Sequence, residues 1–325
     1  MKLRQKCKHF RILIIGRANA GKTTILQKIC NTNEEATIQD AKGNMIPMST
    51  ITPSNMRGMH DIEKSLIFPS NQGFVFHDSR GIEAGGKQEL DIVQNFIAKR
   101  AKSHNLEDRI HVIWYCIPVD NDRIFTAAEK SFFDNLSRHG APVIAIFTKF
   151  DHRDIESFMS LQEEGLEDAE AKAKASQHAK EVFEKEYLPD IYNLSYPPQR
   201  HVYLRDMQEP DSSVSELAER TAEVLENGVL RLMFVSTQRS SITLCIKYAI
   251  EQYVLPFYAL LILYFPSRVV VKWFIDYRKK SHKGPAALMS RADVYQFACH
   301  VRPFYSLKST DCFLLSLPGS CVVPI

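Results

Sequence analysis

The sequence predicts an α/β fold, a mostly parallel β-sheet with helices on both faces, followed by a helical C-terminal extension. Short runs that are apolar throughout, such as Ile110–Ile117 and Val143–Phe147, alternate with segments whose apolar residues repeat at helical spacing. Strands of continuous apolar character are typical of a parallel sheet buried on both faces. A glycine loop also joins the first apolar run, Ile12–Ile15, to a segment with helical spacing.

The remaining elements continue this alternation along the chain. Residues 32–72 are polar and irregular, which predicts a mobile loop followed by a strand near Ile62–Phe68. Residues 153–187 are rich in Glu, Ala and Lys and predict a long, mostly solvated helix, with Gly165 as the place where it can break. The other predicted strands are Gly73–Asp78 and His201–Leu204, and the other predicted helices are Leu90–Ala101, Ala127–Leu136 and Ser215–Leu232.

Composition and charge set the broad class of the protein. The chain has 325 residues, 45% of them apolar and 24% charged, as in a soluble globular protein. Its formal net charge of +3 does not point to nucleic acid, and we expect no nucleic-acid partner. The seven cysteines contain no C-x-x-C pair, which argues against a disulfide framework and a zinc site. We therefore expect a reducing compartment and a cytoplasmic location.

The segment Gly16–Thr23 reads GRANAGKT and fits the pattern G-x-x-x-x-G-K-T. Glycines permit backbone angles at which consecutive N–H groups curl around phosphate oxygens, and the following helix points its positive end at the same phosphates. Lys22 is expected to reach the β- and γ-phosphates, and the Thr23 hydroxyl to ligate Mg²⁺. The nucleotide-binding residues predicted in this segment are Gly16, Asn19, Ala20, Gly21, Lys22, Thr23 and Thr24.

A second motif, Asp78-Ser79-Arg80-Gly81, places D-x-x-G at the end of a predicted strand. An acid there can hold Mg²⁺, usually through water, and the Gly81 N–H can meet the γ-phosphate. We therefore predict Asp78 as a metal residue, and Gly81 together with Lys22 as catalytic residues. The threonine that would complete the Mg²⁺ shell lies before the second strand; Thr52 is our prediction and Thr50 the alternative.

A third motif, Thr148-Lys149-Phe150-Asp151, follows a buried-type strand. A carboxylate at Asp151 can accept two hydrogen bonds, from the guanine N1–H and the exocyclic amine. Adenine lacks this pair of donors, so the carboxylate would go unpaired with ATP and the site would reject it. Lys149 would lay its aliphatic stem over the base, and Thr148 completes the predicted nucleotide-binding set.

Together the three motifs resemble those of the translation-factor-related (TRAFAC) P-loop GTPases, the class that includes Era-like, septin-like and Ras-like G domains. The runs Arg57–Ile62, Phe76–Gly81 and Ile146–Asp151 are similar to runs in fungal G domain-containing proteins. The resemblance covers about the first 240 residues. It implies a three-layer P-loop NTPase G-domain fold that binds GTP and GDP.

The sequence departs from these G domains at three positions. The base motif usually begins with Asn, but some Rho-like G domains have Thr, so Thr148 implies guanine preference with a weaker tie to the phosphate loop. Ile82 follows Gly81, where Ras-like proteins place the Gln that orients water. We therefore expect slow hydrolysis unless Glu83, a bound cation, a partner or dimerisation completes the site. The fifth motif has no obvious match, and Leu204-Arg205-Asp206 is our hypothesis for it.

Asn19 has two interpretations. It occupies the position at which potassium-activated relatives have an Asn that coordinates a monovalent cation, so K⁺ is a candidate cofactor beside Mg²⁺. Asn also tolerates a left-handed backbone in a loop, which is the simpler interpretation and the one we favour.

The C-terminal part has a different composition. Residues Ile242–Ile275 are apolar but interrupted by charges and prolines, and the longest uncharged run, Gln252–Ser267, is shorter than a bilayer span. Three interpretations stay open: a helix packed on the G domain, favoured for Ile242–Ile250; a membrane-associated segment at Tyr253–Ile275; or a dimerisation element. The predicted parts are a G domain at residues 1–240, an apolar helical extension at 241–284 and a poorly ordered tail at 285–325.

These observations predict a guanine-nucleotide-binding switch that hydrolyses GTP slowly with Mg²⁺. The alternative is a membrane-associated scaffold that binds nucleotide structurally without turnover, an interpretation that Ile82 keeps open. An ATP-dependent kinase or ATPase is a third hypothesis, and Asp151 argues against it. The sequence does not identify a protein partner, and both a homodimer and an effector protein are compatible with it.

Overall fold

The computed structural model of the chain describes residues 7–40, 45–46, 62–79, 87–121, 123–135 and 141–251. The chain divides into two compact units, one of residues 2–245 and one of residues 246–325 with Met1. The elements that carry the predicted motifs belong to the first unit. The described part of the second unit is residues 246–251, where helix α10 (Ile242–Ala249) ends.

One β-sheet organises the first unit. Its described strands lie in the order β3-β2-β4-β5-β1-β6-β7-β8. Neighbours from β5 to β8 run parallel, whereas β4, β2 and β3 extend the sheet with antiparallel pairs. The sheet is therefore mostly parallel, as the sequence predicts. The strands are β1 (Phe10–Gly16), β2 (Thr37–Gln39), β3 (Met45–Ile46), β4 (Ser65–Phe68), β5 (Asn71–Asp78), β6 (Val112–Pro118), β7 (Val143–Thr148) and β8 (Arg200–Tyr203).

The central strands owe their position to their composition. Every residue of β6 and β7 is buried, and β1 is buried at all residues except Arg11. Such strands are stable only where both of their faces are covered, because an uncovered face would leave apolar side chains in water. The predicted apolar runs thus form the middle of the sheet.

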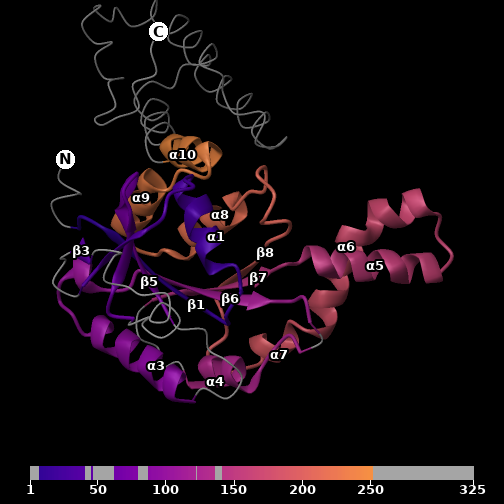
Figure 1. Cartoon of the computed structure of the whole chain (residues 1–325), viewed down its shortest axis with the longest axis horizontal. Helices are drawn as coiled ribbons and strands as arrows, with labels where there is room; N and C mark the ends of the chain where they lie inside the picture. The colour runs from indigo at the N-terminus through magenta and orange to yellow at the C-terminus, as the bar shows by residue number, and fades with distance from the viewer. Residues whose placement is uncertain are drawn as a thin grey trace, which may run out of the picture. The chain divides into compact units, whose positions relative to one another are not determined.

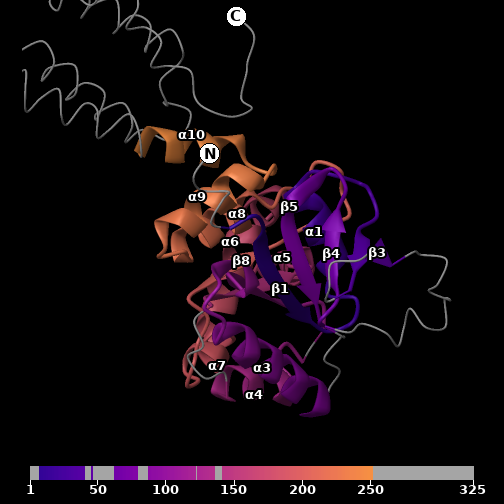
Figure 2. The ribbon, with the colours of Figure 1, turned by 90° about the vertical axis from the view of Figure 1, so that its left-hand side faces the viewer.

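Helices cover both faces of the sheet (Figure 1). On one face Phe10 and Phe234 pack with ring centroids 5.2 Å apart, and on the other Tyr115 and Phe132 pack at 4.7 Å. Figure 2 shows the same three layers from the side. The first face carries α1 (Lys22–Cys30), α8 (Ser215–Val224) and α9 (Gly228–Thr237); the second carries α3 (Lys87–Ala101), α4 (Ala127–Asn135) and α7 (Pro189–Tyr192); η2 (Leu106–Asp108) precedes β6.

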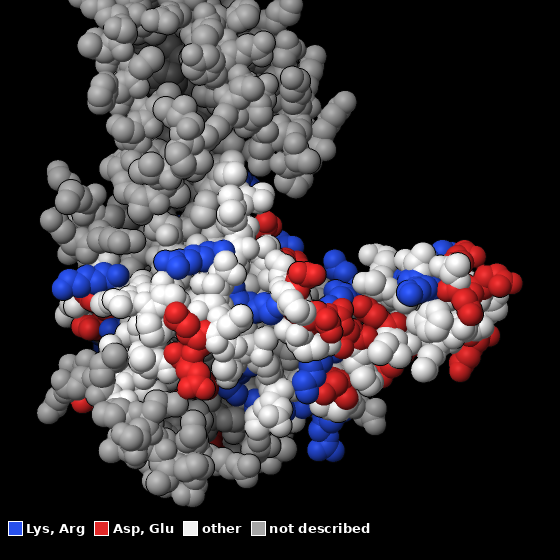
Figure 3. All heavy atoms as spheres, turned by 45° about the horizontal axis from the view of Figure 1, so that its top comes forward, with Lys and Arg blue, Asp and Glu red and all other residues white. Residues whose placement is uncertain are grey.

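A helical hairpin, α5 (Asp151–Glu163) and α6 (Asp168–Glu186), projects from the sheet as an arm (Figure 1). The sequence predicts one helix that can break near Gly165, and the chain does turn there, with Gly165 at φ 95°. α6 buries Ala171, Ala175 and Ala179 at helical spacing, because small side chains let two helices pack closely. Acidic side chains gather at the far end of the arm (Figure 3), in agreement with the predicted solvated surface.

Two predicted elements were wrong in detail. The single helix expected at Ser215–Leu232 is two helices, α8 and α9, because the Asn227 side chain accepts hydrogen bonds from the N–H groups of Val229 and Leu230 and starts a new helix. The polar segment expected as a loop contains the short antiparallel strands β2 and β3, which pair with each other and, through β2, with β4. Their short, weakly apolar sequences gave no alternating pattern to find.

The predictions for the C-terminal part fall largely beyond the described residues. Tyr253–Ile275 and the tail at 285–325 both lie there. Within the described residues, none of the helices has the length and apolar character needed to cross a membrane.

Candidate nucleotide-binding site

The predicted motifs meet at one edge of the sheet. In the strand register Ile14 of β1 pairs with Asp78 of β5, Gly16 pairs with Cys116 of β6, and Pro118 of β6 pairs with Thr148 of β7. These residues are at the carboxyl ends of parallel neighbours. The glycine loop, the acid that ends β5 and the motif that begins at the last residue of β7 are therefore side by side, at the edge where open α/β sheets bind ligands.

The loop that follows β1 has a backbone that its sequence explains. Gly16 approaches β6 so closely that a Cβ on it would lie 2.4 Å from the Cys116 carbonyl oxygen, a contact that no side chain could make. Asn19 and Gly21 both take the left-handed backbone, at φ 59° and 75°. The Asn19 side chain is exposed, whereas Ala20 is buried and its N–H donates to the Arg17 carbonyl at 3.3 Å.

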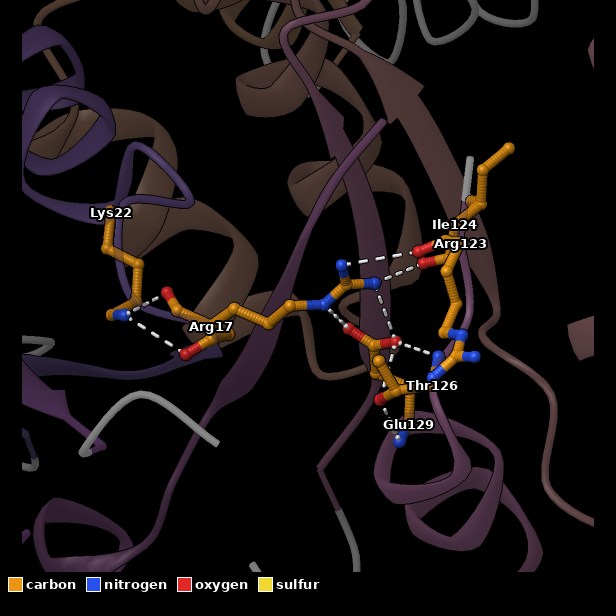
Figure 4. Close-up of polar contacts among 7 residues, drawn as sticks. Arg17, Lys22, Arg123, Ile124, Thr126 and Glu129 are labelled. Carbon is orange, nitrogen blue, oxygen red and sulfur yellow. Dashed lines mark hydrogen bonds and ion pairs between the residues drawn. The ribbon is translucent and has the colours of Figure 1, made fainter. Parts of the chain in front are cut away.

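Helix α1 begins directly after this loop, at Lys22. Gly21 offers no side-chain cap and the first turn contains no acidic residue, so the positive end of the helix dipole is not neutralised by its own side chains. The Lys22 ammonium lies across the loop and donates to the carbonyls of Gly16 at 3.1 Å and Arg17 at 2.9 Å (Figure 4). Thr23 is exposed and Thr24 is half-buried on the same turn. The loop and helix together form a concentrated set of anion-binding donors.

Asp78 is the last residue of β5 and lies beside this loop, and its two neighbours in the chain make hydrogen bonds to the surrounding structure. The Ser79 N–H donates to the Ile14 carbonyl at 3.1 Å. His77 is buried; its Nδ1–H donates to the Ile62 carbonyl at 2.9 Å and its Nε2 accepts from Arg11 at 3.2 Å. Burial, and then the nearby Arg100 and Arg11 charges, lower the pKa of His77 to about 3, so it stays neutral at pH 7.

The motif after β7 forms the other end of the site. Thr148 is buried, and its hydroxyl has no hydrogen-bond partner among the described residues. Lys149 has a left-handed backbone at φ 58° and donates to Asp120 at 2.6 Å. Burial raises the pKa of Asp120, but the hydrogen bond and charge of Lys149 outweigh it and hold the pKa below its usual value.

Asp151 is the first residue of α5, and its Oδ1 accepts from the Asp206 N–H at 3.0 Å. The segment after β8 that we considered for the fifth motif therefore contacts the base motif. The Leu204 carbonyl also accepts from the Phe150 N–H at 3.0 Å, and Arg205 pairs with Asp154 of α5 at 2.7 Å. The segment after β8 and the start of α5 are thus fastened together.

The family comparison agrees with this geometry. Residues 11–149 match the family model described as "50S ribosome-binding GTPase". That range runs from β1 through the phosphate loop and Asp78 to Thr148 and Lys149. Residues 11–149 have the α/β fold of a P-loop GTPase G domain. The family match ends at residue 149, so it does not test the role predicted for Asp151.

Three solved structures that are similar to the chain share little sequence with it. The G domain of the T. maritima FeoB iron transporter has 14% identity and a TM-score of 0.34, covering 66% of this chain and 98% of that one. An S. thermophilus NFeoB mutant bound to GDP has 13% identity and a TM-score of 0.35, covering 93% and 92%. A mutant of Aquifex aeolicus Era has 16% identity and a TM-score of 0.33, covering 67% and 57%. The comparison with curated proteins finds no match.

Some predicted residues of the G domain lie outside the described part of the chain. These include Gly81, Thr52 with its alternative Thr50, and the Ile82 and Glu83 that follow Gly81. Their roles stay predictions. The remaining predicted residues lie in the phosphate loop and the start of α1, at the end of β5, at the β7–α5 junction or, for Leu204–Asp206, directly after β8.

Sequence reasoning missed two carboxylates that hold the G domain's loops. Asp120 pairs with Lys149, and Glu129 of α4 pairs with Arg17 of the phosphate loop. Asp120 has no motif around it and could not have been found. Glu129 stands three residues after Thr126, which is the T-x-x-E pattern of a capping box. Its position at the start of a helix could therefore have been predicted from the sequence, but its pairing with Arg17 could not.

Two shallow hollows lie away from this edge of the G domain. One, of about 660 Å³, lies against β8, where the Tyr192 hydroxyl and His201 Nδ1 are 2.7 Å apart. The other, of about 670 Å³, lies at the amino ends of β6 and β7 and includes Pro142 and Pro198. Neither is lined by a residue predicted to bind nucleotide, so they do not compete with the assignment of the site.

Proposed function

We propose that this G domain binds GTP and GDP with Mg²⁺ and hydrolyses GTP slowly. One observation carries the proposal: the phosphate loop after β1 and the motif Thr148–Asp151 after β7 lie at the same sheet edge, with only β6 between their strands. A nucleotide has its phosphates at one end and its base at the other. An anion-binding loop and a base-reading carboxylate on nearby strands match those two ends.

At the phosphate end, the main-chain N–H groups of residues 17–21 and the start of α1 supply the donors. The Lys22 ammonium has its hydrogen bonds to the Gly16 and Arg17 carbonyls available for exchange. Because phosphate oxygens are charged, bonds to them are stronger than bonds to neutral carbonyls. We infer that the ammonium turns from the loop carbonyls to the phosphate when nucleotide binds.

At the base end, Asp151 would select guanine. One of its oxygens accepts from Asp206, which fixes the carboxylate's orientation. Guanine presents two adjacent donors to such a group, whereas adenine presents an acceptor at N1 and leaves the carboxylate unpaired. Lys149 is held by Asp120 and can cover the base with its stem.

The residues present fit Mg²⁺ as the metal. Thr23 and Asp78 offer a hydroxyl and a carboxylate, the oxygen ligands that this hard cation prefers, and Thr52 is the predicted third residue. Within the described residues, His, Cys, Asp and Glu do not gather into groups of three or more that could hold a metal alone. With so few protein ligands, Mg²⁺ would take its other ligands from phosphate oxygens and water. When bound, Mg²⁺ would neutralise charge on the phosphate oxygens.

Slow hydrolysis follows from Ile82, since a hydrophobic side chain cannot orient the attacking water. The Gly81 N–H would contact the γ-phosphate. K⁺ at Asn19 is a further proposal, in which a monovalent cation neutralises developing charge. The left-handed backbone of Asn19 also has the simpler explanation given above. Comparing GTP turnover in KCl and NaCl decides between them, because equal rates would reject the cation role.

The decisive experiment is titration of the purified protein with fluorescently labelled GTP, GDP and ATP in Mg²⁺. We expect GTP and GDP to bind and ATP to bind at least about a hundredfold more weakly, since two hydrogen bonds to a charged acceptor are lost. ATP binding as tight as GTP binding would reject guanine recognition. Binding of none of the three would reject the phosphate-loop assignment.

The cellular setting is also a proposal. We place the protein in the cytoplasm, with an effector protein or a second copy of itself as partner, and with membrane contact through Tyr253–Ile275 as an open interpretation. Flotation of the full chain with anionic vesicles tests the membrane contact, because a segment that does not insert or adsorb leaves the protein at the bottom of the gradient.

A further inference from the structure

A buried ion pair joins the phosphate loop to helix α4 (Figure 4). The Arg17 guanidinium donates to Glu129 through Nε at 2.8 Å and through Nη2 at 2.9 Å. The exposed fraction of the side chain is 14% for Arg17 and 2% for Glu129. A two-point contact of this kind fixes orientation as well as distance.

The Glu129 carboxylate has further hydrogen-bond partners that restrict its orientation. Its Oε2 accepts from the Thr126 N–H at 2.6 Å and from the Thr126 hydroxyl at 3.0 Å. Thr126 in turn caps α4, since its hydroxyl accepts from the Glu129 N–H at 3.4 Å. The carboxylate is therefore locked by the helix start, and it presents a fixed partner to Arg17.

Arg17 is equally occupied, and its side chain points away from the loop that would hold phosphate. Besides Glu129, its guanidinium donates to the carbonyls of Arg123, at 3.4 Å, and of Ile124. Its own carbonyl accepts from the Lys22 ammonium and from the Ala20 N–H. The side chain thus acts as a brace, and the main chain of the same residue belongs to the phosphate cradle.

The base end of the site is attached to the same connecting segment, the residues 119–126 between β6 and α4. Asp120 holds Lys149 at 2.6 Å, and the Asn121 carbonyl accepts from Arg153 of α5 at 2.7 Å. That attachment is more exposed, with 41% of the Lys149 side chain and 32% of the Asp120 side chain accessible.

We propose that Glu129 is a positioning residue for nucleotide binding, which acts through Arg17 to hold the first half of the phosphate loop in the shape that receives the β-phosphate. The proposal rests on the proposed function of this site as a guanine-nucleotide site. It assigns no contact between Glu129 and nucleotide. The ion pair with Arg17 contacts the phosphate end, whereas Asp120 on the same connecting segment contacts Lys149 at the base end.

The test compares GDP with GMP, which differ by the β-phosphate that the loop cradles. In Glu129→Gln the shape of the side chain is kept and the charge is removed. We expect the GDP affinity to fall about ten- to a hundredfold, the range for residues that orient a binding group from behind it. The GMP affinity falls much less, so the GDP-to-GMP affinity ratio shrinks.

Two control variants separate this effect from a general loss of structure. Asp120→Asn weakens the base end, so GDP and GMP lose affinity together and their ratio stays within about twofold of wild type. Lys130→Met lies on α4 beside Glu129 but pairs with Asp190 at 2.8 Å, away from the loop. It should leave both affinities and their ratio as in wild type. A purely structural weakening of α4 would lower GDP and GMP binding in proportion.

A second variant covers the case in which Glu129→Gln does not fold. Arg17→Met with Glu129→Met removes both charges, a change that folded proteins often tolerate. It should fold and show the reduced GDP-to-GMP ratio. An unchanged ratio in either folded variant overturns the proposal, and so does the failure of both variants to fold, because the pair would then be structural only. If wild type itself binds neither GDP nor GMP, the proposed function has failed instead.

Discussion

The phosphate end and the base end of the site are built by different means. At the proposed phosphate end, backbone groups would bind the nucleotide, and the loop that carries them has a close approach at Gly16 and a buried ion pair. At the proposed base end, side chains would contact the nucleotide, and their neighbours are charged side chains after β6, on α5 and after β8. Buried pairs are little affected by salt, whereas exposed pairs are screened. The ion pair at the phosphate end should therefore be less sensitive to salt than the ion pairs at the base end.

The largest expected effect comes from removing the lysine at the phosphate end. Lys22→Ala removes charge-assisted bonds to phosphate, each worth roughly 1.5–3 kcal/mol, so triphosphate and diphosphate affinity should fall on the order of a thousandfold. Calorimetric titration with GDP in Mg²⁺ measures it. Lys28→Met is the control, because Lys28 lies on the same helix but donates to the carbonyls of Glu209, Pro210 and Ser212. Retained GDP affinity in Lys22→Ala would contradict the site.

Acid should weaken the sheet through two buried histidines, His77 near the carboxyl end of β5 and His111 at the amino end of β6. Burial lowers the pKa of His111 to about 4, and that of His77 to about 3, below the ordinary value near 6.5. Both are neutral in the folded protein, and the unfolded chain binds their protons first. Stability is therefore complete above about pH 6.5 and is lost as the pH falls toward 4.

For His111 the loss between pH 7 and pH 5 is about 2 kcal/mol, at about 1.4 kcal/mol per pH unit. Urea unfolding at the two pH values measures it. The loss should shrink by that amount in His111→Asn, and it should persist in His104→Gln, whose side chain is exposed. An equal loss in wild type and His111→Asn would show that other groups cause the acid sensitivity.

At the base end, Asp151→Asn should reduce guanine preference. The amide keeps one acceptor oxygen but loses the charge and offers a donor where guanine also has one, so GDP affinity should fall roughly ten- to a hundredfold relative to ADP. Competition of both nucleotides against a labelled probe gives the ratio. Asp154→Asn, one turn along α5, lowers the charge equally but removes the pair with Arg205, and it should keep the preference. Loss of preference in both variants would point to charge rather than to base contact.

The smallest effect concerns the carboxylates around Asp206. The pKa of Asp206 is raised, first by burial and then by the charges of Asp151 and Asp154. At pH 7 these two carboxylates therefore repel the Asp206 carboxylate. Asp206→Asn should stabilise the fold by less than about 1 kcal/mol, because the site is exposed, and Asn tolerates the left-handed backbone at φ 47°. The gain should vanish in high salt, measured by urea unfolding. A gain that is independent of salt would exclude repulsion as its cause.

The phosphate end and its supporting ion pair also differ in how far the sequence predicts them. The phosphate loop is a local pattern of glycines, Lys22 and Thr23 between a strand and a helix, and local patterns are readable. The parallel character of the central strands follows from apolar runs in the same way. The ion pair between Arg17 and Glu129 could not be predicted, because the two residues are far apart in sequence and neither segment has a pattern that indicates the contact. The split between α8 and α9 was missed because Asn227 and Gly228 interrupt an amphipathic pattern that continues across them.

The helical arm is joined directly to the base-reading position. Asp151 is at once the proposed purine sensor and the first residue of α5, a helix of 13 residues that therefore extends about 20 Å. A stiff rod that pivots at its base moves its free end much farther than the base itself. Because α5 begins at Asp151, a shift of this residue on nucleotide binding would also move the start of the hairpin, and a pair of spin or fluorescent labels on the hairpin would measure that movement.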